Sequence, residues 1–366
     1  MILDEGRIIT GNDNTGVLIN EVGHTIRGCG TIEATIVNYG TIESDCITSI
    51  MMVKSPVENH GAMRDLGGIL AFRGSAAQIT NVGTISASGG TIWIDLGATI
   101  YNSQGVIRAD GRSIELSRNS TGTIQGGTID GVGTGTVHVQ GAATLKDVTL
   151  TPAATLRTWP GATTLATGTA FTNRGTSRVQ GTFTVGNTTN YIQSGGATSL
   201  EGGSLNAGRP VQIQGGELRG YGTIAANVAS FGTVSPDPLL GALTIQGDYF
   251  QYSSGLLNVG FAGSDQGRPA CCRSPGTRRW TALISAAAVN GYAPVPGRQY
   301  EVLSYGSALR RVRHRAGNLA GQLDVTALYD ADGVGLLVTG VVGVRTSLAA
   351  AGAALLRAGR GGGGVR

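Results

Sequence analysis

The sequence predicts an all-β chain wound as a parallel β-helix, a solenoid of stacked coils with two or three strands per turn. Gly accounts for 61 of the 366 residues and charged side chains for only 14%, while Thr, Ile and Val recur throughout, which disfavours long helices. A twenty-residue phrase occurs at 26–45 and again 192 positions later at 218–237, with Arg, Gly, Thr, Ile, Ala and Asp in register. Repetition of this kind is typical of solenoids.

The repeat unit is Gly-Thr-Ile or a close variant, and each copy opens a strand of about five residues with alternating character. Side chains alternate along a strand, so Ile32 and Ile85 are expected inside the coil and the preceding Thr on the opposite face. Gly and Asn, as in "NYGTI" (38–42) and "NVGTI" (81–85), are expected at the corners, because both tolerate left-handed backbone. Copies begin at Gly30, Gly40, Gly83, Gly90, Gly122, Gly127, Gly135, Gly222 and Gly232.

Stacking is what we expect to stabilise the coils. Ordering each residue costs about 1–2 kcal/mol, whereas one buried Ile or Val returns only about 1.5–3 kcal/mol, so a single coil cannot fold alone. Matching phrases lie roughly ten to twenty residues apart, which is too short for a crossover helix between parallel strands. The alternative is a stack of antiparallel hairpins, which would need more two-residue Asn-Gly or Asp-Gly turns than the sequence contains.

Three regions follow from the pattern: β-helix repeats over residues 1–238, further coils and a β-hairpin cap over 239–341, and a Gly-, Ala- and Arg-rich tail over 342–366. The hairpin is predicted from "LDVTALYDADGVGLLVT" (323–339), with its turn at Asp330 to Gly333. A cap is expected because a bare terminal coil exposes strand edges and core. The tail is expected to form a short helix and then a flexible end.

Charge is distributed unevenly along the chain. Residues 1–267 contain 14 basic and 19 acidic side chains, a net −5, while residues 268–366 contain 13 and 4, a net +9. A protein that binds nucleic acid usually lines its main surface with Lys and Arg to displace counterions from phosphate. The repeat region does the reverse, so we expect no nucleic-acid partner.

The beginning of the chain, "MILDEGRIIT", has no basic segment followed by an apolar core, so no secretion signal is visible. No apolar stretch approaches the roughly 20 residues that a membrane-spanning helix needs. Two alternatives stay open: a soluble chain inside the cell, or a chain whose beginning is missing.

The cysteines are too few and too unevenly placed for a disulfide framework or a Cys-x-x-Cys metal site. They are Cys29, Cys46, Cys271 and Cys272. Cys29 and Cys46 either bridge neighbouring coils or are two small buried side chains.

The histidines show no spacing typical of metal ligands. They are His24, His60, His138 and His314. In "TVHVQ", Val137 and Val139 share one face of the strand, so His138 is expected at the surface. The chain also lacks a phosphate-binding loop and a Gly-x-Ser-x-Gly elbow. We therefore expect no metal and no cofactor.

Four aspartates suggest an enzymatic alternative. Asp95, Asp110, Asp130 and Asp147 follow one another at spacings of 15, 20 and 17 residues, close to one coil each. Glycoside hydrolysis needs two carboxylates about 5–10 Å apart, so Asp95, Asp110 and Asp130 are the catalytic candidates of a polysaccharide lyase or glycoside hydrolase. No tight acidic cluster accompanies them, and acids are expected on any solvated coil. The non-enzymatic interpretation is therefore preferred.

Two tryptophans are candidate sugar platforms. Trp93 in "TIWIDL" is expected on the outer face, because Ile92, Ile94 and Leu96 are assigned to the inner one. Trp159 precedes the turn-forming Pro160. Exposed aromatic side chains often mark binding surfaces, although single ones often have no ligand.

The stretch "NYIQSGGATSLEGGSLNAGRPVQIQGGELRGYGTIAANVASFGTVSPDPLLGALTIQGDYFQYSSGLLNV" (190–259) resembles the passenger β-helices of bacterial autotransporters and related haemagglutinin-like surface proteins. The phrases that carry the resemblance are "GYGTIAANV", "GTVSPD" and "GALTIQGDYFQYSSGLLNV". It covers roughly residues 20–340 and is strongest from 160 to 260. The resemblance implies a right-handed β-helix, secreted or on the cell surface, with a structural, adhesive or protective role. The implied partners are extracellular polysaccharide or a host or matrix protein.

The sequence departs from this family in two ways. A complete autotransporter would continue into a membrane β-barrel, so outer-membrane attachment would need a barrel or anchor on another chain, unless this is a secreted relative or a fragment. Residues 264–280 and 307–317 also break the alternation. We expect these two segments to be read out of frame from a GC-rich gene, since Arg outnumbers Lys by 25 to 2. The alternatives are a basic surface that attracts anionic polymers or a solvated loop.

Overall fold

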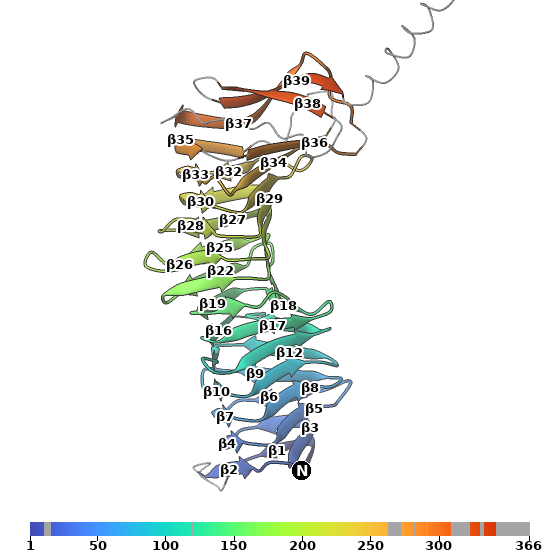
Figure 1. Ribbon diagram of the computed structural model, residues 1–366. Coiled ribbons are helices and arrows are strands. Elements are labelled where there is room, and N and C mark those ends of the chain that lie inside the picture. The colour runs from blue at the N-terminus through green and yellow to red at the C-terminus, as the bar shows by residue number, and fades with distance from the viewer. Residues whose placement is uncertain are drawn as a thin grey trace, which may run out of the picture.

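The computed structural model describes residues 1–10, 16–118, 120–262, 272–280, 283–290, 292–308, 323–329 and 333–341, and in these ranges all regular structure is β-strand. The strands wind into an elongated stack of coils, from β1 (Ile2–Ile8) at one end to β39 (Gly333–Val341) at the other (Figure 1). Each strand of the repeats pairs in parallel with the strands of the coils before and after it. The predicted parallel β-helix is therefore confirmed, and its coils have three strands per turn.

We name the three faces of the stack A, B and C in chain order. Face A consists of β2 (Val17–Asn20), β4 (Thr35–Asn38), β7 (Val57–Asn59), β10 (Gln78–Asn81), β13 (Ala98–Tyr101), β16 (Thr121–Gln125), β19 (Ala142–Lys146), β22 (Thr163–Thr167), β25 (Thr182–Val185), the second parts of β27 (Ala197–Ala207) and β29 (Glu217–Ala225), and β32 (Leu243–Ile245). Face B consists of the first parts of β1 and β3 (Thr25–Ile32), then β5 (Thr41–Ser44), β8 (Ala62–Asp65), β11 (Thr84–Ala87), β14 (Val106–Asp110), β17 (Thr128–Val132), β20 (Thr149–Leu150), β23 (Ala170–Asn173), β26 (Asn190–Gln193), β28 (Val211–Ile213), β30 (Val228–Ser230) and β33 (Tyr249–Gln251). Face C consists of the second parts of β1 and β3, then β6 (Ile50–Val53), β9 (Ile69–Arg73), β12 (Thr91–Asp95), β15 (Ser113–Leu116), β18 (Thr136–Val139), β21 (Thr155–Thr158), β24 (Thr176–Val179), the first parts of β27 and β29, β31 (Thr233–Pro236), β34 (Leu256–Phe261) and β36 (Leu283–Ala288).

The core is a continuous column of inward side chains. On face A the column runs in register through Ile36, Val57, Ile79, Ile100 and Ile124, each at most 2% exposed. Faces B and C contribute parallel columns, and the buried apolar residues form one cluster. Each buried aliphatic side chain contributes about 1.5–3 kcal/mol, so the column is the main source of stability, as the alternating pattern predicts.

The corner glycines serve two different purposes. Gly30 and Gly127 have positive φ values of 130° and 69°, as expected. Gly83 does not need positive φ, but a Cβ there would lie 2.0 Å from the carbonyl oxygen of Gly61 in the neighbouring coil. Close approach of backbones, and not only left-handed geometry, therefore explains why glycine recurs.

The expectation that asparagine takes left-handed backbone at the corners holds for Asn290, with a φ of 52°, but is wrong for Asn38 and Asn81. Asn38 and Asn81 are absent from the non-glycine residues with positive φ in the described chain, and their side chains are buried. They belong to a ladder in which each amide nitrogen donates to the Oδ1 atom of the Asn one coil further on, at 2.6–2.7 Å. The ladder consists of Asn20, Asn38, Asn59, Asn81 and Asn102.

The twenty-residue phrase that occurs twice forms two windings of the same stack, but on different faces. In β3, Gly28 and Gly30 have φ values of 119° and 130°, and in β29 Gly220 and Gly222 have 98° and 139°. Both strands therefore bend at the same phrase. However, β3 passes from face B to face C, whereas β29 passes from face C to face A. The second copy is thus one face later in the coil.

A disulfide joins neighbouring coils near the N-terminal end. The sulfur atoms of Cys29, in β3, and Cys46, which follows β5, are bonded, and their Cα atoms lie 5.8 Å apart. This separation is usual for a disulfide. Cys29 and Cys46 therefore bridge neighbouring coils and are not two separate buried thiols.

Parallel stacking continues beyond residue 238 and ends in an antiparallel cap. The backbone of β35 (Cys272–Trp280) pairs with β32 and β33, so this stretch is a strand and not a solvated loop. β37 (Gln299–Ala308) and β38 (Leu323–Tyr329) both pair antiparallel with β39, which confirms the predicted hairpin cap. Residues 264–271, 309–317 and 342–366 lie outside the described residues, and the out-of-frame hypothesis stays a prediction. No helix in the described ranges is long and apolar enough to span a bilayer.

Candidate functional site

Polar and aromatic side chains form a strip along face C, one coil after another. His138 lies in register with Arg157, and Arg157 with Arg178; the same position continues through Ser199 to Arg219. A second row follows at the ends of these strands. We call both rows the face C strip, which consists of His138, Arg157, Trp159, Arg178, Gln180, Glu201, Arg219 and Tyr221. Because coils rise by about 4.8 Å each, neighbouring side chains of the strip lie within reach of one ligand.

Trp159 and Arg157 form one end of the strip. The indole Nε1 of Trp159 donates to Nδ1 of His138 at 3.1 Å, and the guanidinium carbon of Arg157 lies 4.9 Å from the indole ring centroid. Trp159 is still 39% exposed. Burial lowers the pKa of His138, and the charge of Arg157 lowers it further. The imidazole is therefore held neutral, which leaves Nδ1 free to accept the indole proton.

The middle of the strip is a clamp between two coils. Arg178 donates to both carboxylate oxygens of Glu201, from Nε at 2.7 Å and from Nη2 at 3.2 Å, and Gln180 donates to Oε2 at 2.9 Å. Two parallel bonds between guanidinium and carboxylate fix both side chains. The clamp holds the charge of Glu201 at the edge of the cavity described next.

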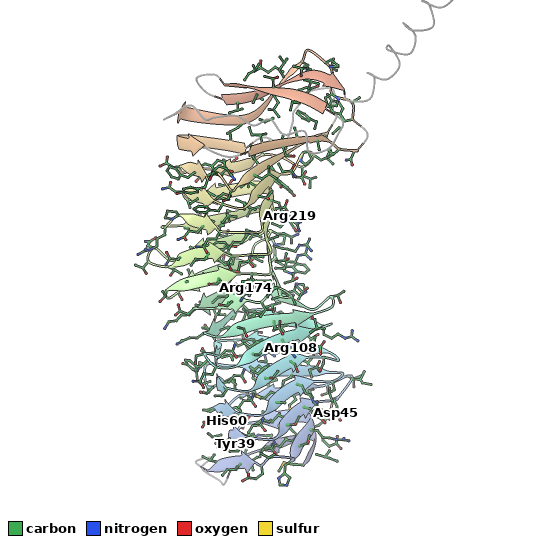
Figure 2. All side chains as sticks on the ribbon, in the orientation of Figure 1. Tyr39, Asp45, His60, Arg108, Arg174 and Arg219 are labelled. Carbon is green, nitrogen blue, oxygen red and sulfur yellow. A yellow bond between two sulfur atoms is a disulfide. The ribbon has the colours of Figure 1, made fainter. Side chains whose placement is uncertain are left out.

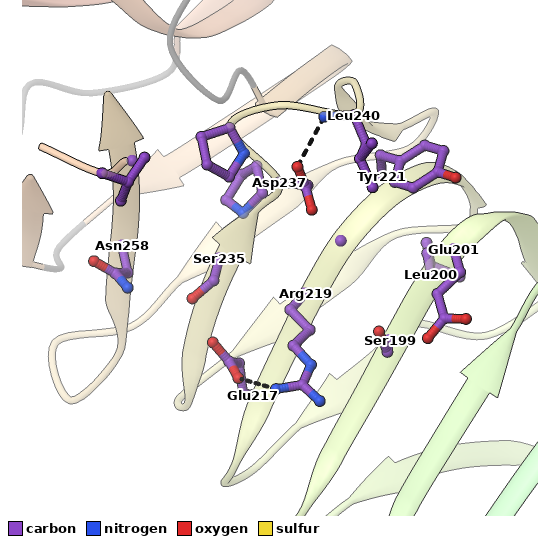
Figure 3. A pocket seen from close by; sticks show the side chains of 15 residues that line it. Ser199, Leu200, Glu201, Glu217, Arg219, Tyr221, Ser235, Asp237, Leu240 and Asn258 are labelled. Atoms are coloured by element: carbon purple, nitrogen blue, oxygen red, sulfur yellow. Dashed lines mark hydrogen bonds and ion pairs between the residues drawn. The ribbon is translucent and has the colours of Figure 1, made fainter. Parts of the chain in front are cut away.

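The other end of the strip opens into a cavity of about 420 Å³ between β27, β29, β31 and β34 (Figure 3). Tyr221 and Arg219 line it, and Arg219 Nη1 donates to Glu217 at 3.3 Å. Asp237 accepts from the backbone nitrogens of residues 239 and 240 at 2.8 Å each. Carboxylate oxygens, a guanidinium and a phenol ring around one cavity can bind the hydroxyls and apolar faces of a sugar.

Trp93 points outward from its strand between the buried Ile92 and Ile94, as predicted. This strand belongs to face C, where Trp93 is in register with Glu115, and Glu115 with His138. Ile92 and Ile94 are buried, but the assignment of Leu96 to the inner face is wrong. Leu96 is 43% exposed with a φ of 54°, because the chain turns there into Gly97.

The ring of Trp93 is more enclosed than that of Trp159. The guanidinium carbon of Arg118 lies 4.6 Å from its centroid and that of Arg73 lies 5.8 Å away. Arg118 and Arg73 are themselves bound to Glu115 and Asp95. Of the two predicted platforms, Trp159 is the one that offers more surface to a ligand.

The structure does not bring the three candidate catalytic aspartates together. Asp95 ends β12 on face C, is fully buried and pairs with Arg73 at 3.6 Å. Asp110 and Asp130 lie on neighbouring strands of face B, where Asp110 is in register with Val132.

Asp130 is held as an ion by its neighbours. Burial raises its pKa, but hydrogen bonds from Thr151 at 2.5 Å and from Arg108 at 2.9 Å outweigh this and keep the pKa below its usual value. Asp147 lies at another corner, where it accepts from the backbone nitrogens of residues 169 and 170. Asp130 and Asp147 are therefore each held by hydrogen bonds from the neighbouring coils.

The sequence did contain a signal for the strip. Arg157 and Arg178 stand 21 residues apart in "LRT" and "SRV", and Arg219 in "LRG" follows after 41 more, or two coils. These arginines can be assigned to one row only when the number of residues per coil is known, and the repeat phrases are spaced too irregularly in the sequence to give that number. Tyr221 and Glu201 are neighbours through the parallel register of β27 and β29, which the sequence alone does not give.

In the described part of the chain, no group of three or more His, Cys, Asp or Glu side chains is placed to hold a metal ion. No protein-family model matches this chain, and a search of curated proteins found no significant match.

Proposed function

We propose that this chain is a secreted or cell-surface β-helix protein, adhesin-like and non-enzymatic, that binds a carbohydrate or a protein along its stacked faces. The observation that carries the proposal is the face C strip. Trp159 and Tyr221 occupy the second row three coils apart, about 14 Å along the axis, with Gln180 and Glu201 between them.

A linear ligand fits this arrangement because it would meet one coil after another. Each coil offers one or two contacts, and such contacts are weak individually but act together when the ligand is continuous. Face C presents aromatic rings at both ends of the strip and hydrogen-bonding groups between them. This combination suits an extended polysaccharide better than a small globular partner.

Two further observations support an extracellular location. The Cys29–Cys46 disulfide is of a kind that persists in oxidising compartments. The repeat phrases resemble those of exported surface β-helices. The alternative, a carbohydrate-active lyase or hydrolase, would need free acids that converge on one site, whereas Asp95 and Asp130 are paired with arginine and Asp95 lies on another face than Asp110 and Asp130.

The proposal is tested by retention of the protein on immobilised polysaccharides and matrix proteins. We expect Trp159→Ala and Tyr221→Ala each to weaken retention on the ligand that binds the wild type. Tyr101→Ala is the matched control, because Tyr101 is 40% exposed on face A, away from the strip. Equal loss in all three variants, or no retention on any surface, would contradict the proposal.

A further inference from the structure

A belt without acidic residues surrounds the Trp159 end of the strip. Between Asp147 and Glu201 the sequence contains no Asp or Glu, but it contains Arg157, Arg174 and Arg178. The belt extends from β20 to the first part of β27, inside a repeat region that otherwise carries more acidic than basic side chains. The positive charge is therefore confined to this belt, and binding of a neutral ligand would not require it.

Arg157 is the arginine of the strip whose charge is not matched. Arg178 is bound to Glu201, and Arg219 to Glu217. Arg157 instead donates from Nε to the neutral amide oxygen of Gln180 at 3.1 Å, and in the described ranges no carboxylate lies within ion-pair distance of it. The neighbouring His138 is held neutral and offers no competing charge.

Arg157 lies beside Trp159, so one ligand can contact both the unmatched charge and the indole ring. The indole is oriented by its bond to His138 and keeps 39% of its surface exposed. An aromatic ring binds the apolar face of a sugar, and a guanidinium binds a carboxylate with two parallel hydrogen bonds. The bond to Gln180 uses only Nε of Arg157.

We propose that Arg157 and Trp159 form a subsite for a carboxylate-bearing sugar, so that the strip selects acidic over neutral polysaccharide. This rests on the proposed function and names the class of its ligand. The carboxylate binds Arg157 while the ring of the same sugar lies against Trp159, and the chain then continues across Gln180 and Glu201 towards Tyr221.

The test compares polygalacturonate with the same polymer after its carboxyl groups have been reduced to alcohols. Titration calorimetry with both probes should show that the wild-type chain binds the acidic form at least about tenfold more tightly. Arg157→Gln should remove this preference, so that the variant binds the acidic and the reduced polymer with equal affinity. Arg174→Gln is the matched control, because it removes the same charge from the same belt, but Arg174 directly follows β23 of face B, outside the strip (Arg174 is labelled in Figure 2).

The possible outcomes separate the two proposals. Equal affinity of the wild type for both polymers overturns the acidic subsite and leaves polysaccharide binding standing. Equal losses in Arg157→Gln and Arg174→Gln overturn the subsite in favour of general charge attraction. If neither polymer binds, both the subsite and the binding of linear polysaccharide by the strip fail. Arg157→Lys, which keeps the charge but loses the planar fork, should restore only part of the preference.

Discussion

Asn38 and Asn59 are fully buried one coil apart, and Nδ2 of Asn38 donates to Oδ1 of Asn59 at 2.7 Å. Each Asn of the ladder also donates to a backbone carbonyl of a neighbouring coil, as Asn38 does to Ala62 at 3.2 Å. Buried amides are stabilising only when they are fully bonded. The ladder therefore fixes the register between the corners of faces A and B.

Asn59→Leu should destabilise the N-terminal coils. The substitution leaves Oδ1 of Asn81 and Nδ2 of Asn38 without their ladder partners, at a cost of about 2–4 kcal/mol. Denaturant unfolding followed by circular dichroism measures the change. Thr80→Ala, on the exposed side of β10, is the control and should change the free energy of unfolding by less than about 0.5 kcal/mol. A loss of similar size in both variants would argue against the ladder.

Gly83→Ala should be poorly tolerated, because its Cβ would lie 2.0 Å from the carbonyl oxygen of Gly61. The coils can accept this atom only by moving apart, so we expect a lower melting temperature or loss of soluble protein. Gly67→Ala is the comparison, since the nearest atom to its Cβ would be Cγ1 of Ile47 at 3.8 Å. If both variants melt together with the wild type, coil spacing is not what requires glycine at position 83.

Reduction should destabilise the chain through the Cys29–Cys46 bond. The bond closes a loop with a sequence separation of 17 residues, which corresponds to a contribution of about 3 kcal/mol. A reducing agent should lower the melting temperature of the wild type but not that of the Cys29→Ser, Cys46→Ser variant. Labelling of both thiols by an alkylating agent without prior reduction would show that the bond does not form.

Acidification should release Trp159 from His138. The pKa of His138 lies below its usual 6.5, since the ring is partly buried and Arg157 lies beside it. The stability linked to the neutral ring is therefore fully present above pH 6.5 and is lost as the pH falls through the lowered folded-state value. Tryptophan fluorescence should show a step in that range that is absent from His138→Gln. A step that survives in the variant would assign the change to another group.

The alternation of side chains predicted most of the fold. Ile32 and Ile85 lie inside as expected, because period 2 is a local property of a strand. Asn59 could not be assigned to a ladder, since its partners are 21 and 22 residues away and become neighbours only when the coil length is known. The alternation of its strand predicts that Leu96 points inward, and only the position of the turn into Gly97 shows that it does not.

The candidate site was harder to predict for the same reason. Trp93 was identified from the alternation of its strand and Trp159 from its position before Pro160, but their common face depends on the register of four strands. The shared corner of Tyr39 and His60, whose rings stack at 4.9 Å (Figure 2), shows how residues one coil apart meet only in the stack. Carboxylates such as Asp95 and Asp130 follow a coil-like spacing in the sequence and still lie on different faces.

The affinity of the protein for oligogalacturonates of increasing length tests the central claim, that a linear polysaccharide lies along face C. Calorimetry should show affinity rising with each added sugar until the ligand extends from Trp159 to Tyr221, and then no further gain. In Tyr221→Ala the plateau should be reached with a shorter oligomer. Affinity that does not depend on length, or a plateau that the substitution does not move, would contradict binding along the strip.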